Sequence, residues 1–252
     1  GTPIGETTAG DVWELNGETA DLAKVQEAYE AKLEPVLPYR TAEAAGPAQE
    51  TPALKYEALN RVAPKVGTAK PRVLIPVFPG NNCEYDSAAA FERAGADVTP
   101  LIVNNLTPAA VAESPQALVK EINKSPIVMI PGGFSGGDEP EGSGKFIATA
   151  FRNPLVKEAV MNMLKNRDGL MLGICNGFQA LIKLGLVPYG EIRDLEDNSP
   201  TLTFNTLGRH ISRMTYTRIA SNKSPWLLNT EVGDMYTIPV SHGEGRFVAS
   251  AE

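Results

Sequence analysis

The 252-residue chain contains few cysteines and few histidines, two of each. The two cysteines, Cys83 and Cys175, lie far apart in the sequence, which argues against a disulfide framework and against the closely spaced ligands of a zinc site. So few cysteines are typical of a reducing compartment, and we expect a cytoplasmic protein without a bound metal.

An excess of basic charge and long apolar runs are also missing. Lysine and arginine number 23 against 30 acidic residues, which gives a formal net charge of −7. This charge argues against broad binding to nucleic acid or to an anionic membrane. No apolar run approaches the roughly 20 residues that a membrane-spanning helix needs, and the N-terminus lacks the layout of a signal peptide. We expect neither a nucleic-acid partner nor a membrane partner.

Glycine and proline, by contrast, are abundant, with 23 and 20 residues. So many turn-forming residues argue against a long helical bundle and favour short strands and helices with many connections. The length suits one sizeable α/β domain with an appendage, or two small domains.

The N-terminal part differs in character from the rest. Apolar residues at helical spacing predict an amphipathic helix over residues 21–33, with Asp21 as its N-cap. An Ala- and Pro-rich stretch follows, with at most a short helix over residues 54–62. We therefore divide the chain into an N-terminal segment 1–40, a linker 41–71 and a main domain 72–252.

Strands and helices alternate within the main domain. Apolar runs predict buried strands at 72–80, 98–103, 126–130 and 169–174, and helical patterns lie at 84–94, 108–122 and 180–184. This alternation predicts an α/β fold, an open, mostly parallel sheet flanked by helices, with ligands at the carboxyl ends of the strands. An alternating pattern over 201–219 indicates antiparallel strands beyond it, and residues 236–240 are strand-like.

A nucleophile elbow is predicted at Gly173-Ile174-Cys175-Asn176-Gly177, where a strand runs into a helix. Such a turn exposes the central side chain at the head of the sheet. The helix N-terminus favours a thiolate there, and the backbone amide of Asn176 can face a developing oxyanion. The alternative is a buried structural cysteine, but the flanking glycines favour catalysis.

A second strand end carries the glycine-rich loop that begins Pro131-Gly132-Gly133-Phe134. Its backbone amides can supply the second donor of an oxyanion hole. A simple glycine-rich turn and a phosphate-binding loop are the alternatives. Two adjacent glycines alone are weak evidence, and the oxyanion-hole interpretation is supported only by their pairing with the cysteine elbow.

A cysteine nucleophile also needs a proton acceptor, usually a histidine oriented by a third group. His210 lies in an alternating segment and is interpreted as a strand or surface residue. His242 follows a predicted strand and precedes Glu244 by two positions, so chemistry alone suggests a triad of Cys175, His242 and Glu244. Cys83 lacks the glycine frame and is interpreted as a loop or helix-start residue.

Four motifs carry a family resemblance: FPGNNCEYD (78–86), PGGFSGGD (131–138), GICNGFQ (173–179) and SHGEGRF (241–247). In this order and spacing they closely resemble the glutaminase domain of phosphoribosylformylglycinamidine synthase. That domain is a flavodoxin-like class I glutamine amidotransferase of de novo purine synthesis. The resemblance covers residues 72–252, and residues 1–40 weakly resemble the tail of the synthase half of fused enzymes.

The resemblance implies that Cys175 attacks the side-chain amide of glutamine, releases ammonia and becomes a thioester that water hydrolyses. It further implies a partner, the synthase domain of the same polypeptide, which uses ATP and magnesium to convert formylglycinamide ribonucleotide to its amidine. The glutaminase domain itself needs no cofactor. The oxyanion and glutamine-binding residues that it implies are Gly132, Gly133, Phe134, Asn176, Gln179 and Asn205.

One departure from the family concerns the catalytic base. In the family the triad histidine and glutamate belong to a His-Pro-Glu motif downstream of SHGEGR, and this sequence contains no such motif. The resemblance thus demotes His242 and Glu244 to positioning or synthase contact, and it predicts a domain truncated at its C-terminus. Two alternatives remain, a noncatalytic interaction fragment and a cysteine hydrolase of the same fold that uses Cys175 with His242.

Overall fold

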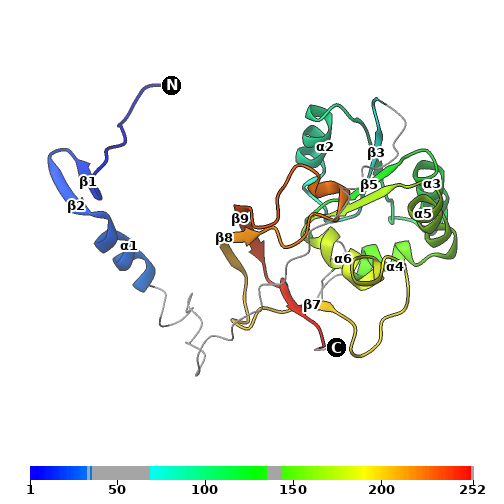
Figure 1. The fold of residues 1–252 in the computed structure, drawn as a ribbon. Helices are drawn as coiled ribbons and strands as arrows, with labels where there is room; N and C mark the ends of the chain where they lie inside the picture. Colours follow the sequence, from blue (N-terminus) through cyan, green and yellow to red (C-terminus); the bar gives the residue numbers. More distant parts are fainter. Residues whose placement is uncertain (33–34, 36–68, 135–143, 251–252) are drawn as a thin grey trace. The chain divides into compact units, whose positions relative to one another are not determined.

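The computed structural model describes residues 1–32, 35, 69–134 and 144–250. The chain divides into two units, Gly1–Glu50 and Thr51–Glu252, and each is described by itself (Figure 1). The short helix expected over 54–62 and most of the predicted linker lie outside the described residues, so the proposed domain boundaries stay a prediction.

The N-terminal unit contains a hairpin followed by a helix. Strands β1 (Val12–Leu15) and β2 (Glu18–Asp21) pair antiparallel around a turn whose residues Asn16 and Gly17 both have positive φ, 54° and 85°. An Asn-Gly pair is the favoured sequence for such a mirror-image turn. Helix α1 (Leu22–Ala31) begins where the side chain of Asp21 accepts the amide of Lys24 at 3.0 Å. The predicted helix and its cap are confirmed, whereas the hairpin had not been predicted.

A parallel four-stranded sheet forms the centre of the second unit. Its strands lie in the order β4 (Asp97–Ile102), β3 (Arg72–Val77), β5 (Ile127–Ile130), β6 (Leu170–Gly173). Every neighbouring pair is parallel. Strand β5 is buried along its whole length, as expected of a central strand that is covered on both faces. The predicted fold class is confirmed.

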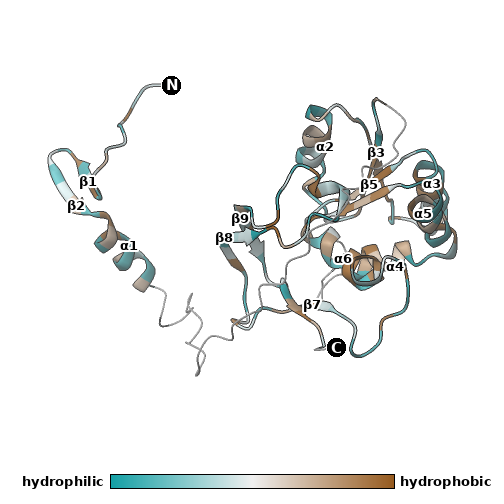
Figure 2. Cartoon of the chain, in the orientation of Figure 1, coloured by the Kyte–Doolittle hydropathy of each residue, from teal (hydrophilic) through white to brown (hydrophobic). Residues whose placement is uncertain are grey.

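Helices cover both faces of this sheet (Figure 1). Successive side chains of a strand point to opposite faces. Leu74, Val128 and Ile130 accordingly pack with α3 (Pro108–Ile122), α4 (Lys145–Phe151), α5 (Pro154–Asn166) and α6 (Asn176–Leu184). Val73, Ile75 and Met129 pack on the other face with α2 (Glu84–Arg93). Figure 2 shows the central strands as the hydrophobic interior between helices with polar outer faces. A short helix, α7 (Leu186–Tyr189), follows α6.

Two antiparallel ribbons follow the α/β part, as the sequence patterns predicted. Strand β8 (Ile211–Arg218) pairs with β9 (Met235–His242), and β7 (Thr201–Thr203) pairs with β10 (Arg246–Val248). The SHGEGR motif is the turn at which the chain leaves β9 and enters β10. Both ribbons contribute to the position of this turn.

Strand β6 is the last strand of the sheet within the described residues, and a tryptophan lies against it. Trp226 belongs to the short 3-10 helix η1 (Pro225–Leu227). Its indole N–H donates to the backbone carbonyl of Met171 at 3.0 Å. Its ring meets Phe91 of α2 edge-on, with 6.3 Å between centroids. The segment between β8 and β9 is thereby fixed to one edge of the sheet.

Candidate active site

Cys175 lies at the junction of β6 and α6, where it caps the helix with φ 53° and ψ −112°. A non-glycine residue rarely adopts such a positive φ, and the conformation costs on the order of 1–3 kcal/mol. The next turn is closed by the Gly177 amide, which donates to the Ile174 carbonyl at 2.9 Å, and by the Gln179 amide, which donates to the Cys175 carbonyl at 2.9 Å. The cysteine side chain is exposed and forms no disulfide. The predicted strand-to-helix elbow is confirmed.

Glycine is required at position 177 because the helix starts against the neighbouring strand. A Cβ at Gly177 would overlap the backbone carbonyl of Ile130, the last residue of β5. The carbonyl of Gly177 lies in turn only 2.6 Å from where a Cβ of Gly173 would sit. The Gly-x-Cys-x-Gly frame therefore allows two backbones to approach closely, which fixes the cysteine over the carboxyl end of the sheet.

The glycine-rich loop after β5 lies directly beside the nucleophile. A Cβ on Gly132 would sit 3.1 Å from the Cβ of Cys175. Gly133 has φ 119° and is bridged to Asn81, and the amide of Phe134 donates to the carbonyl of Gly80 at 3.0 Å. The loop is thus held by the segment that follows β3. The Phe134 side chain is exposed.

Asn176 and Gln179 turn inward at the start of α6, and both are buried. The side-chain amide of Asn176 donates to the Gln179 carbonyl oxygen at 3.3 Å, and Gln179 donates to the backbone carbonyl of Glu244 at 2.8 Å. The nucleophile helix is therefore connected to the SHGEGR turn.

Asn205 holds the same turn from the other side. Its side-chain nitrogen donates to the carbonyls of His242 at 2.8 Å and Arg209 at 3.0 Å, and its backbone amide donates to Gly243 at 2.9 Å. Its side-chain oxygen lies 3.0 Å from Nδ1 of His242 and accepts a hydrogen bond from that nitrogen, which assigns the proton to Nδ1. Asn205, Gln179 and the His242–Glu244 turn thus form one connected group.

The positions of the two histidines differ from that of the histidine in a catalytic triad. Within residues 69–134 and 144–250, no hydrogen bond joins His242 to Cys175. His210 is exposed and its Nε2 lies 2.9 Å from the Ser241 hydroxyl. In the same described ranges, no cluster of three or more His, Cys, Asp or Glu side chains is placed to hold a metal ion. No helix of the described part is long and apolar enough to cross a membrane.

The structure adds one residue that the sequence did not place at this site. The Sγ of Cys83, at the start of α2, lies 3.6 Å from the position of a Cβ on Gly132. Partial burial raises the pKa of the Cys83 thiol, and the negative charges of Cys175, Asp86 and Glu84 raise it further. The only available sequence signal was the position of Cys83 after a strand end.

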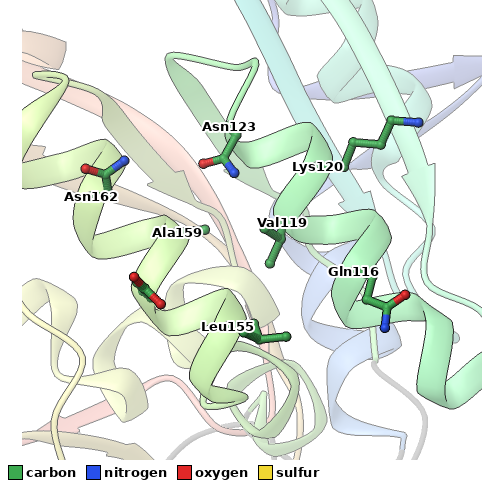
Figure 3. Close-up of a pocket in the computed structure, with 8 residues that line it drawn as sticks. Gln116, Val119, Lys120, Asn123, Leu155, Ala159 and Asn162 are labelled. Atoms are coloured by element: carbon green, nitrogen blue, oxygen red, sulfur yellow. The ribbon is translucent and has the colours of Figure 1, made fainter.

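A pocket of about 450 Å³ lies elsewhere, between α3 and α5 (Figure 3). None of its lining residues follows the carboxyl end of a strand, so it is separate from the Cys175 site. The lining residues are Gln116, Val119, Lys120, Asn123, Leu155, Glu158, Ala159 and Asn162.

Removing the side chain of Asn205 is expected to destabilise the fold. Asn205→Ala deletes several hydrogen bonds of a buried side chain, and we expect the free energy of unfolding to fall by about 1–3 kcal/mol. Urea denaturation measures this change. Asn229→Ala, at an exposed position, is the matched control and should change the free energy by less than about 0.5 kcal/mol. Equal effects of the two substitutions would show that Asn205 does not organise the turn.

The family profile and the individual relatives that match this chain agree with one another. Residues 70–252 match the sequence profile of the CobB/CobQ-like glutamine amidotransferase domain. The chain is similar to phosphoribosylformylglycinamidine synthase subunit PurQ of Dehalococcoides mccartyi, with 36% identity over 184 residues, 73% of this chain and 66% of the relative. PurQ of Cereibacter sphaeroides is 34% identical over 72% of this chain and 68% of its own length.

The coverage is lower for PurQ of Methanococcus maripaludis, which is 34% identical over 70% of this chain and 59% of its own length. The chain thus spans less than two thirds of the length of several of these relatives. Among solved structures, it is similar to a chain from the structure of PurLQS from Thermotoga maritima. The TM-score is 0.53 and the identity 27%, over 73% of this chain and 71% of that one.

Proposed function

Because the chain belongs to the CobB/CobQ-like glutamine amidotransferase family, we propose that it hydrolyses the side-chain amide of glutamine through a thioester at Cys175. The observation that carries this proposal is the strained elbow at Cys175 with Gly132 beside it. The same arrangement of a nucleophile at a helix start and backbone amides on an adjacent loop is suited to acyl transfer.

In the proposed reaction, the Cys175 sulfur attacks the amide carbon of glutamine and the carbonyl oxygen becomes an oxyanion. The backbone amides of Asn176, at the N-terminus of α6, and of the Gly132-Gly133 turn stabilise that oxyanion. The carbon–nitrogen bond then breaks, the nitrogen takes up the proton that the Cys175 thiol has lost, and ammonia leaves. Water attacks the resulting thioester, which yields glutamate and the free thiol.

We assign His242 and Glu244 to positioning rather than to proton transfer. His242 Nδ1 is engaged by Asn205 rather than by Cys175, and the carbonyl of Glu244 is engaged by Gln179. These contacts support a role in which the SHGEGR turn and Gln179 shape the glutamine site. The side chain of Phe134, exposed on the oxyanion loop, belongs to the same site in this proposal.

The ammonia is proposed to serve the ATP-dependent conversion of formylglycinamide ribonucleotide to its amidine in purine biosynthesis, in the cytoplasm. The names of the relatives support this acceptor, since they are subunits of phosphoribosylformylglycinamidine synthase. The partner is a synthase polypeptide, with ATP and magnesium bound there rather than in this domain. A synthase on the same polypeptide is the form suggested by residues 1–40.

A diazoketone analogue of glutamine tests the proposal directly, because it alkylates the nucleophile of the glutamine site. We expect one adduct per chain at Cys175, found by peptide mapping, and protection by excess glutamine. Glutamine hydrolysis is measured in parallel as glutamate formed, with and without a purified synthase.

Other results contradict the proposal in distinct ways. An adduct at any other residue removes Cys175 as the nucleophile. Cleavage of unrelated esters or amides without any reaction of glutamine identifies a cysteine hydrolase. The absence of both labelling and hydrolysis, with synthase present, identifies a noncatalytic interaction module.

A further inference from the structure

The two cysteines of the chain both lie close to Gly132. Cys83 follows β3, Gly132 follows β5 and Cys175 follows β6, and β5 lies between the other two strands in the sheet. The Cβ of Cys175 and the Sγ of Cys83 both lie within 3.6 Å of the position that a Cβ on Gly132 would occupy. Because glycine has no side chain, no side chain at position 132 separates the two cysteines.

Both thiols are free and exposed, which makes them accessible to small oxidants. Their chemical settings differ. Cys175 lies at the exposed tip of the elbow at the N-terminus of α6, where an electrophile can reach its sulfur. Cys83 has acidic neighbours, and its pKa is raised by partial burial and by the charge of Cys175. Cys175 is thus the thiol that reacts first, and Cys83 remains a thiol beside it.

We propose that Cys83 is a resolving cysteine that captures Cys175 as a disulfide when a peroxide oxidises the nucleophile. The Cys175 thiolate attacks one oxygen of the peroxide, which forms a sulfenic acid and releases hydroxide or an alkoxide. The Cys83 sulfur then attacks the Cys175 sulfur, and the sulfenic oxygen leaves as water with the Cys83 proton. The peroxide is reduced, two thiols are oxidised, and a dithiol reverses the change.

The side chain of Cys83 is held only weakly, whereas its backbone is fixed. The Sγ of Cys83 now contacts the side-chain oxygen of Asn82 at 3.4 Å, a weak interaction that rotation of the side chain gives up. The backbone around it is kept in place by Ser87, whose hydroxyl donates to the Cys83 carbonyl at 2.7 Å.

The disulfide has two consequences for the chain. It blocks thioester formation, since the Cys175 sulfur is no longer available. It also protects that sulfur, because a sulfenic acid without a neighbouring thiol oxidises further to the sulfinic acid, which dithiols do not reduce. The inference needs only a reactive Cys175 and does not depend on glutamine as the substrate.

Mild treatment of the full chain with hydrogen peroxide tests the proposal. We expect wild-type protein at low concentration to lose two hydrogens by intact mass, to remain monomeric on a non-reducing gel, and to yield a peptide linking Cys83 to Cys175. Dithiothreitol should restore Cys175 labelling by an alkylating agent. This measurement on the unaltered chain is independent of glutaminase activity.

The variants Cys83→Ser and Cys175→Ser separate the two roles. Cys83→Ser should form a sulfenic acid at Cys175 that dimedone traps. After longer exposure to peroxide, the Cys175 labelling that dithiothreitol restores in this variant should be at least about fivefold lower than in wild type. Cys175→Ser should form no disulfide. Sulfinic acid at Cys175 of wild type without a linked peptide, disulfides only between chains, or equal recovery of Cys83→Ser and wild type would each overturn the proposal.

Discussion

Substitution of Cys175 by serine is expected to lower glutamine hydrolysis by at least about 10³-fold, since the hydroxyl is a far weaker nucleophile than the thiol. The change replaces one exposed atom at the tip of the elbow, so the fold and the binding of glutamine should persist. Glutamate formation measures the loss, and labelling by the diazoketone should disappear with it.

Cys83→Ser is the matched control, because it makes the same chemical change at the other cysteine of the site. We expect glutamine hydrolysis by this variant, in the absence of oxidant, within about twofold of wild type. If Cys83→Ser abolished hydrolysis while Cys175→Ser retained it, the assignment of the nucleophile would be wrong.

A glycine at position 175 should separate stability from reactivity. Cys175→Gly relieves the positive φ of 53°, and we expect it to raise the free energy of unfolding by about 1 kcal/mol while removing all activity. Urea denaturation of this variant beside Cys175→Ser measures the contribution of the backbone alone. A lower stability than that of the serine variant would show that the elbow is not strained.

The second large effect is expected at Gly177. In Gly177→Ala the new methyl group would occupy the space of the Ile130 carbonyl, and a backbone atom of a central strand cannot rotate away. We expect a loss of about 3 kcal/mol or more in the free energy of unfolding, with a displaced α6 and loss of Cys175 labelling. Urea denaturation and labelling rates measure the two effects.

Gly243→Ala provides the control for a glycine of the same unit. A Cβ at Gly243 meets no atom within 4 Å, so the change in free energy should stay within about 0.5 kcal/mol. A small effect at Gly177, comparable to that at Gly243, would mean that the close approach of α6 to β5 is not required by the fold.

The sheet could be predicted because its strands are nearly continuous apolar runs. Segments such as 72–77 and 127–130 are buried on both faces and stand out without any knowledge of their partners. Helix α5 and the N-terminal hairpin were missed although local signals existed. Asn153 caps α5 before Pro154, and Asn16-Gly17 is a typical hairpin turn.

The geometry of the site could be predicted only where all the residues that form it lie within one short motif. The elbow at Cys175 is local, since its glycines, nucleophile and helix start lie within five consecutive residues. The contact of Cys83 with this site depends on the order of three strands, which no local pattern specifies. The Gln179–Glu244 and Asn205–His242 hydrogen bonds likewise join segments far apart in the chain, so motif order suggested their common site but not their contacts.

Trp226 has a consequence for the behaviour of the protein at high concentration. A free edge strand presents backbone groups that can pair with another chain and start aggregation. The indole of Trp226 occupies one such acceptor on β6, the carbonyl of Met171, and its packing on Phe91 keeps the segment in place. This tryptophan therefore removes one backbone acceptor of the edge from pairing with another chain, a role that is separate from the chemistry at Cys175.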